Sequence, residues 1–246
     1  MPTHFTPEAL KFLRGLARNN NRDWFGERKA IYERELKAPL LALIEEINGE
    51  FVDFAPEHIR PAHKCMFRIY RDTRFSPDKT PYKKHISAWF ARQDLEKKSG
   101  GGFYFHLSGK EVVIAAGVYM PEREQLLAIR NHLLENHAEY RRLSTNRKLQ
   151  RLMGDFDGQR LTRPPKGFPK DHPAVDLIAC RQWGVSTTLP AEAALQPTLR
   201  KQIISRFQAA APLIEFLNRP LIGHASKPKV TLDFSSNPPK RKLMKV

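Results

Sequence analysis

The chain has 246 residues, of which 41% are hydrophobic, and this length and composition suit one large folded domain with a buried core. No stretch approaches the roughly 18 apolar residues of a membrane-spanning helix, and we expect no membrane partner. The first residues also lack the basic start and apolar run of a signal peptide. The two cysteines, Cys65 and Cys180, stand in apolar surroundings. We expect two buried free thiols and a cytoplasmic location.

The net charge of +16 is concentrated in three stretches. Residues 60–92 carry nine Lys or Arg against two Asp, residues 139–171 carry nine against four acids, and residues 224–246 carry six against one. Such stretches predict positive surfaces that attract an anionic partner, either an anionic small molecule or nucleic acid. A solvated basic surface is the plainer interpretation, and composition does not choose between them.

The first fifty residues predict helices. Thr6-Pro7-Glu8 has the form of an N-cap followed by a proline and an acid in the first turn. We expect Asp23 to cap the next helix. Pro39 should break or kink a further helix, which ends near Gly49.

The middle of the chain changes to a period of two, which is typical of strands. Residues 64–71 (KCMFRIYR) and 84–91 (KHISAWFA) alternate, and residues 102–120 (GFYFHLSGKEVVIAAGVYM) have the pattern of a hairpin that turns at Ser108-Gly109-Lys110. An antiparallel sheet with one apolar and one polar face follows from this alternation. We expect its polar face to carry Arg68, Tyr70, His85, Ser87, Tyr104 and His106.

The last part of the chain predicts mostly helices. They are expected from Pro121 to about residue 134, over about 137–153, over 174–179 and as a pair from Pro190, with a loop at 154–173 and a strand at 182–188. The predicted fold is α+β, a single domain over residues 1–223. A central, mainly antiparallel sheet is flanked by N-terminal and C-terminal helices, and residues 224–246 form a disordered basic tail.

The segment RIYRDTRFSPDKTPYKKH, residues 68–85, carries the densest set of functional groups. Its eight fixed positions are Arg68, Arg71, Asp72, Arg74, Phe75, Asp78, Lys79 and Tyr82. This pattern resembles the signature of an uncharacterised family, domain of unknown function 2461. The resemblance extends to NNNRDWF at 19–25, GFYFHL at 102–107 and PPKGFPKDHP at 164–173, and covers roughly residues 5–218. It implies a shared fold and implies no activity.

These residue types suit an anion-binding site. Arginine binds planar oxyanions through paired hydrogen bonds, lysine adds a point charge and a tyrosine hydroxyl donates. We therefore expect Arg68, Arg74, Lys79 and Tyr82 to converge on a phosphate or carboxylate. Arg71, Asp72 and Asp78 complete the predicted ligand-binding set, with the carboxylates as partners that orient the arginines.

Three alternatives stay open. In the first, Asp72 and Asp78 pair with the motif's own cations, so that the segment is a structural or interaction module held by an ion-pair clamp, with Phe75 filling the core. The three basic stretches 60–92, 139–171 and 224–246 may bind nucleic acid as one surface. The protein may also be an enzyme that acts on the bound anion, with His85 or His106 as the proton carrier. The sequence does not identify a cofactor and predicts no metal site, because it has few cysteines and its histidine pairs are spaced by five.

Overall fold

The computed structural model describes residues 5–95, 100–155 and 158–222. Its centre is a five-stranded antiparallel sheet with strand order β1-β2-β3-β5-β4. The strands are β1 His85–Ala91, β2 Gly101–Ser108, β3 Glu111–Val118, β4 Gly154–Asp155 and β5 Trp183–Pro190. Together with the surrounding helices, this sheet confirms the predicted α+β class and the antiparallel arrangement.

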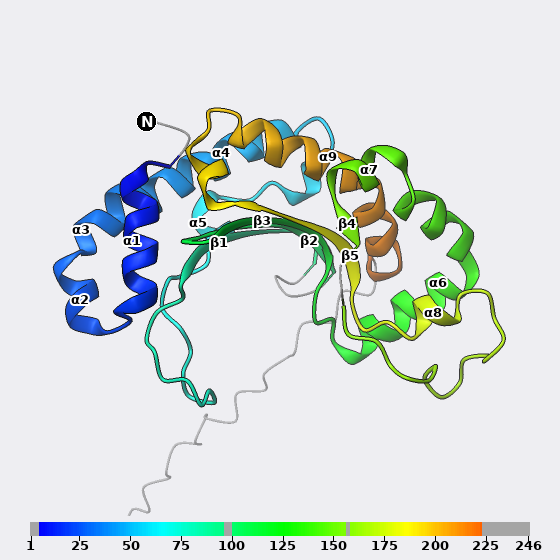
Figure 1. The fold of residues 1–246 in the computed structure, drawn as a ribbon. Coiled ribbons are helices and arrows are strands. Elements are labelled where there is room, and N and C mark those ends of the chain that lie inside the picture. The colour runs from blue at the N-terminus through cyan, green and yellow to red at the C-terminus, as the bar shows by residue number, and fades with distance from the viewer. Residues whose placement is uncertain (1–4, 96–99, 156–157, 223–246) are drawn as a thin grey trace, which may run out of the picture.

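Two long helices cover one face of the sheet. They are α4 (Ala38–Phe51) and α9 (Leu199–Asn218), which lie above the strands in Figure 1. Their aromatic side chains meet those of β1 and β2: the Phe51 ring centroid lies 5.2 Å from those of Phe90 and Phe103, and Phe207 lies 5.1 Å from Phe103. Burial of these rings is the main force that holds the helices to the sheet.

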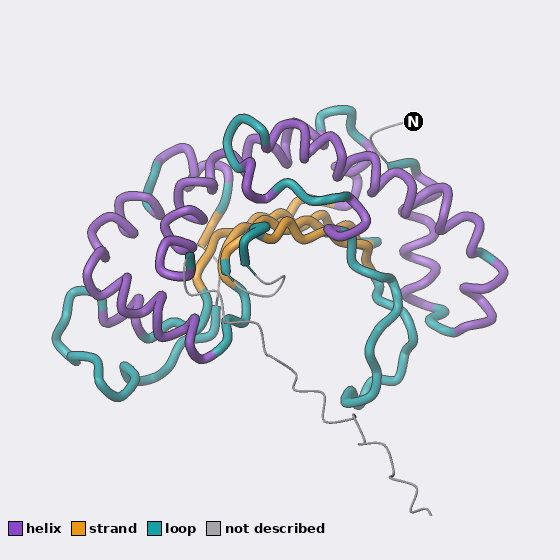
Figure 2. Tube along the Cα trace, turned by 180° about the vertical axis from the view of Figure 1, so that it is seen from behind, coloured by secondary structure: helices purple, strands orange, loops and turns teal. Residues whose placement is uncertain are grey.

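The remaining helices, of which α6 is the longest in the described structure, form two arms at opposite ends of the strands. Beside the β2–β3 turn lie α1 (Pro7–Arg18), α2 (Arg22–Glu27) and α3 (Lys29–Tyr32), and the single turn α5 (Ala62–Cys65) contacts β1. At the opposite ends of the strands, where β3 ends and β5 begins, lie α6 (Arg123–Ser144), α7 (Arg147–Leu152) and α8 (Val175–Ile178). Figures 1 and 2 show the resulting arch, in which the described chain leaves the second face of the sheet without a covering helix.

The helix ends follow the sequence in part. The Thr6 hydroxyl accepts a hydrogen bond from the Ala9 amide, as expected of an N-cap. The cap of α2 is Asn21, whose Oδ1 accepts from the Trp24 amide at 2.9 Å, so the prediction of Asp23 was wrong. No break occurs at Pro39: a π-helical turn, Glu33–Lys37, leads directly into α4, which places the proline in the first turn of that helix.

The expected strand at residues 64–71 is absent from the structure. Lys64 and Cys65 belong to α5, and the following residues make two isolated bridges, Met66 with Ala88 and Tyr70 with Tyr82. Between these bridges, residues 67–69 face residues 83–87, so three residues oppose five. This surplus interrupts the ladder as a bulge does, and a regular strand cannot form.

The remaining elements agree with the sequence, apart from two boundaries and the short strand β4, which forms at the start of the expected loop 154–173 by pairing with β5. The hairpin β2–β3 turns at the expected residues. The helix α6 runs through the predicted gap, which appears as a kink at Asn136 with φ −123° and ψ 25°. The expected C-terminal helical pair is a 3₁₀ turn, Ala191–Leu195, and the unbroken α9; the other 3₁₀ turns are Pro56–His58 and Arg219–Leu221. The predicted basic tail at 224–246 lies outside the described residues.

Two predictions about the chemistry of the chain can be compared with the fold. Cys65 and Cys180 are both buried free thiols, which confirms the expectation from the sequence. Among the residues that the structure describes, none of the helices combines the length and the apolar character needed to cross a membrane.

Candidate functional site

The motif residues form a loop that hangs below the N-terminal arm in Figure 1. Arg71 holds the two sides of the loop together. Its guanidinium donates to Asp78 at 2.6 Å, to the Thr80 hydroxyl and to Ser76. Asp78 also accepts from the Thr80 amide at 2.9 Å. Hydrogen bonds from the amide and hydroxyl of Thr80, followed by that from Arg71, lower the pKa of Asp78 to about 2.

A second pair closes the tip of the loop. The Arg74 Nε and Nη2 atoms donate to the two oxygens of Asp72 at 3.0 and 2.8 Å, which is the bidentate geometry of a guanidinium with a carboxylate. These hydrogen bonds lower the pKa of Asp72 to about 2. The side chains are 76% and 44% exposed. The pair orders the tip while leaving its charges in contact with water.

The other motif residues do not converge on one point. Lys79 donates to the Thr73 carbonyl oxygen at 2.9 Å. The buried Tyr82 ring stacks on Phe25 of α2 with centroids 4.1 Å apart, and burial raises the pKa of its phenol. Arg68 is exposed, and within the described residues it has no carboxylate in ion-pair contact. The structure thus brings each loop arginine to its own aspartate and places Tyr82 in the helical layer.

Phe75 lies in an unexpected environment. Its side chain is 93% exposed, so the alternative that placed it in the core was wrong. The Arg74 guanidinium carbon lies 5.7 Å from the centre of its ring. A single exposed ring is common on protein surfaces, and the neighbouring guanidinium is what makes this one suited to stacking on a planar ligand.

The uncovered face of the sheet carries the two candidate histidines. The His85 and His106 rings stack with centroids 4.8 Å apart. The Tyr104 hydroxyl lies 3.2 Å from the Nδ1 atom of His106 and also hydrogen-bonds to the buried Ser87. The Nε2 atom of His106 lies 3.9 Å from a Glu111 oxygen. We call these five residues the imidazole cluster.

The environment keeps both imidazoles uncharged at neutral pH. Burial lowers the pKa of His106 to about 4. Burial, followed by the proximity of His106 and the charge of Lys83, lowers the pKa of His85 to about 4. The His106 side chain nevertheless remains 17% exposed. Partly accessible histidines with strongly shifted pKa values are a common mark of functional sites.

The predicted polar face was correct for four residues and wrong for Tyr70. His85, Ser87, Tyr104 and His106 lie together as expected. Tyr70 instead packs against Tyr82 and Phe25, with ring centroids 5.4 and 6.3 Å apart, because the break in the ladder turns it toward the helices. No contact in the described structure joins Arg68 to the cluster.

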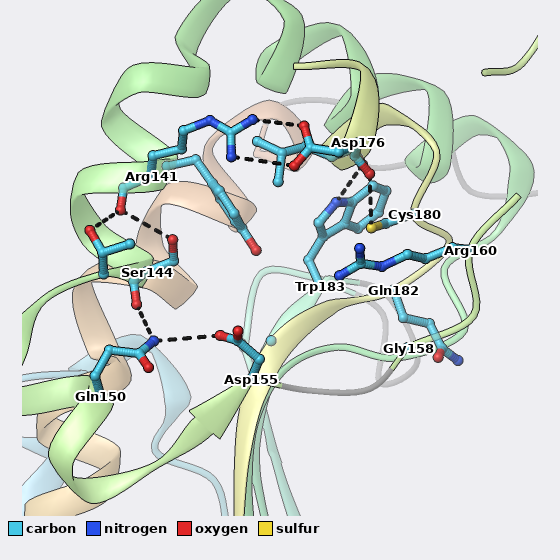
Figure 3. A pocket seen from close by; sticks show the side chains of 14 residues that line it. Arg141, Ser144, Gln150, Asp155, Gly158, Arg160, Asp176, Cys180, Gln182 and Trp183 are labelled. Carbon is cyan, nitrogen blue, oxygen red and sulfur yellow. Dashed lines mark hydrogen bonds and ion pairs between the residues drawn. The ribbon is translucent and has the colours of Figure 1, made fainter. Parts of the chain in front are cut away.

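The sequence reasoning missed a pocket in the second arm, which Figure 3 shows in close-up. It has a volume of about 440 Å³ and lies between α6, α7, α8 and β5. Its residues come from four separate segments between Tyr140 and Gly184. No local spacing connects them, and the sequence signal in this region was the excess of cations over acids in stretch 139–171. Among the described residues, no group of three or more His, Cys, Asp or Glu is arranged to hold a metal ion.

Comparison with known proteins bears on the family alone. A family model described as a conserved hypothetical protein, domain of unknown function 2461, matches residues 8–216. No curated protein and no solved structure matches the chain. The match covers most of the length and includes the motif loop, the sheet and the second arm, and the chain therefore belongs to the family of domain of unknown function 2461.

Proposed function

We propose that this is a cytoplasmic protein that binds a phosphate- or carboxylate-bearing ligand on the open face of the sheet, at the imidazole cluster. The observation that carries the proposal is the stacked pair His85 and His106, both uncharged and partly accessible, on a face that no described helix covers. Nothing in the packing of the core requires two histidines here, because the aromatic core lies on the opposite face.

The cluster offers an anion several hydrogen-bond donors. Imidazole N–H groups and the hydroxyls of Tyr104 and Ser87 can donate to an oxyanion, and the charge of Lys83 acts on His85. A bound anion favours the imidazolium form, so binding should take up protons and become tighter as the pH falls. An enzyme is the stronger version of this proposal, with His106 as the group that accepts or donates the proton.

The motif loop has a supporting role in this proposal. The pairs Arg71–Asp78 and Arg74–Asp72 order the loop beside the sheet. Arg68 is exposed and makes no contact with the cluster in the part of the chain that the structure describes, so its part in this proposal is to add to the positive field that attracts an anion. Preorganised donors bind more tightly than mobile ones, because less conformational freedom is lost on binding.

The test is a titration with inorganic phosphate, and with small carboxylates in parallel, followed by the NMR shifts of the histidine rings. We expect the His85 and His106 resonances to move together, and affinity to rise toward acid pH. The variant His106→Gln should lose binding by about tenfold or more, which is the loss expected for one strong hydrogen bond. The control is His63→Gln, because His63 is exposed on α5, away from the sheet face. Equal binding by both variants would refute the proposal.

A second candidate function, nucleic-acid binding, is favoured by the exposed Phe75. A ring beside a guanidinium can stack on a base while cations contact the phosphates. The second arm supplies further exposed cations that have no carboxylate partner within the described chain, namely Arg160, Arg163, Lys166 and Lys170. In this case the slope of log affinity against log salt should fall by about one for each contacting cation that is removed.

A further inference from the structure

The pocket of the second arm is a separate site. Its volume of about 440 Å³ falls within the roughly 300–1,000 Å³ typical of small-molecule sites. Its walls come from α6, α7, β4, α8 and β5 and from the loop that holds Arg160. The imidazole cluster and the motif loop contribute no residue to it.

Most of the polar groups in the pocket are already engaged. Arg141 donates to both oxygens of Asp176, at 2.7 and 3.3 Å, and to the Pro173 carbonyl oxygen at 2.8 Å. The hydroxyls of Ser144 and Thr145 both donate to the Arg141 carbonyl oxygen. Figure 3 shows these interactions along one wall. These groups form one wall of the pocket, and the charges of Arg141 and Asp176 neutralise each other.

Two charged side chains remain available. Arg160 reaches into the pocket below Cys180, and the Asp155 carboxylate lies on the other side of the opening (Figure 3). Within residues 5–95, 100–155 and 158–222, Arg160 has no acidic partner, and Asp155 receives one long hydrogen bond of 3.4 Å from Gln150. One cation and one anion are therefore presented to the same cavity.

The buried phenol of Tyr140 lies close enough to both charged side chains for each to shift its pKa. Burial raises the pKa of Tyr140, Cys180 and then the Asp155 carboxylate raise it further, and the guanidiniums of Arg160 and Arg141 oppose the rise. The phenol therefore lies within electrostatic reach of all three charged groups. Tyr140, Leu177 and Trp183 are the large apolar residues in the wall, and each is at most 9% exposed.

A ligand that matches this arrangement carries both charges and an apolar group. The Asp155 carboxylate would repel a simple anion, and the Arg160 guanidinium would repel a simple cation. We infer that the pocket binds a free amino acid with a large apolar side chain, whose carboxylate pairs with Arg160 and whose ammonium pairs with Asp155. Tyr140 and Leu177 then contact the side chain.

The inference is tested with phenylalanine, leucine and methionine by calorimetric titration of the full-length protein. We expect at least one of them to bind. Its N-acetyl derivative, which lacks the ammonium, and its amide, which lacks the carboxylate, should each bind about tenfold more weakly or worse. Failure of all three amino acids to bind at millimolar concentration, or equal binding of the blocked derivatives, overturns the inference.

Variants then assign the two contacts. Arg160→Gln and Asp155→Asn should each weaken binding by about tenfold or more, and the melting temperature of the free protein should stay the same because neither charge has an ion-pair partner in the described structure. Arg163→Gln, an exposed cation of the same loop outside the pocket wall, should bind like the unmodified protein. His106→Gln should also leave amino-acid binding intact, so the two proposals can fail independently. Unchanged affinity in Arg160→Gln or Asp155→Asn would overturn the inference.

Discussion

The rings of His85 and His106 stack at 4.8 Å with their planes 25° apart, although the two residues are diagonal and not opposite in the β1–β2 ladder. The residue opposite His106 is Ser87, and His85 faces Ser108. Aromatic side chains reach such diagonal neighbours. The arrangement favours uncharged rings, because two imidazolium groups at this distance would repel each other.

The stacked pair predicts a loss of stability in mild acid. The folded pKa values of about 4 lie below the ordinary value of 6.5, so the unfolded chain binds more protons between these limits. Stability is therefore complete above about pH 6.5 and falls as the pH drops toward 4, by at most about 3 kcal/mol for each histidine. The double variant His85→Gln/His106→Gln should lose less stability between about pH 7 and about pH 5 than the unmodified protein.

Urea denaturation at the two pH values measures this difference. His58 is also buried with a lowered pKa and destabilises both proteins in acid, so its contribution cancels in the comparison. An identical pH dependence of the unfolding free energy in the two proteins would show that the pair is not held uncharged.

The two ion pairs of the motif loop should differ in importance. Asp78 pairs with Arg71, whose side chain is 24% exposed, and also accepts from the Thr80 amide. Asp72 pairs with the 76% exposed Arg74. Surface pairs contribute little, so we expect Asp78→Asn to lower the urea midpoint more than Asp72→Asn. A larger effect from Asp72→Asn would mean that the tip pair, and not Arg71, orders the loop.

Protonation of the two aspartates should break both ion pairs at lower pH values than those at which the histidines take up protons. Their aspartate pKa values are lowered from 3.8 to about 2, so the contribution of each pair is present above pH 3.8 and is lost as the pH falls toward 2. The carboxyl carbon resonances of Asp72 and Asp78 should titrate with midpoints near 2. Midpoints at the ordinary value of 3.8 would contradict the pairing.

A substitution at Phe75 distinguishes a binding role of the motif loop from a structural one. Because its ring is 93% exposed, Phe75→Ser should change the free energy of unfolding by no more than about 0.5 kcal/mol. If the ring stacks on a base, the same substitution should weaken binding of single-stranded nucleic acid by about 1–3 kcal/mol. Fluorescence anisotropy with a labelled oligonucleotide measures this loss. Unchanged affinity would remove the observation that favours nucleic-acid binding.

The parts of the fold that depend on local pattern could be predicted from the sequence. Alternation identified β1, β2 and β3, and the same alternation placed His85 and His106 on one face. The break at residues 64–71 could not be predicted, because the surplus of residues between the Met66 and Tyr70 bridges is set by the partner segment. The predicted ligand set of the motif was partly an ion-pair network, since sequence alone does not say whether Arg71 faces a ligand or Asp78.

The second-arm pocket depends on contacts between distant residues. Arg141 and Asp176 are 35 positions apart, and the bend that brings them together follows from the packing of α6 against α8. Residue types in that region indicated a basic surface only. The information that encloses the neighbouring Asp155 and Arg160 in one cavity with α6 and α8 is therefore tertiary.

Two asparagines each bind the backbone N–H and C=O of a single residue, and they give a matched pair for the last prediction. Asn218 at the end of α9 accepts from the Gly101 amide at 2.6 Å and donates to the Gly101 carbonyl oxygen at 3.1 Å. Asn20 does the same with Tyr82, at 3.0 and 2.9 Å. The side chain of Asn218 is fully buried, whereas Asn20 is half-buried. The two sites thus differ mainly in their access to water.

Replacement by leucine removes both hydrogen bonds at each site and keeps the branching of the side chain at Cγ. At Asn218 it leaves a buried N–H and a buried C=O of Gly101 unpaired, and each such group costs roughly 1–3 kcal/mol, so we expect a loss of about 2–5 kcal/mol. At Asn20, water can replace the amide, and the loss should be about 1 kcal/mol. Urea denaturation of Asn218→Leu and Asn20→Leu measures both values. Equal losses would show that water does not reach the Tyr82 peptide, and that the motif loop is anchored to the N-terminal arm as firmly as the sheet is anchored to α9.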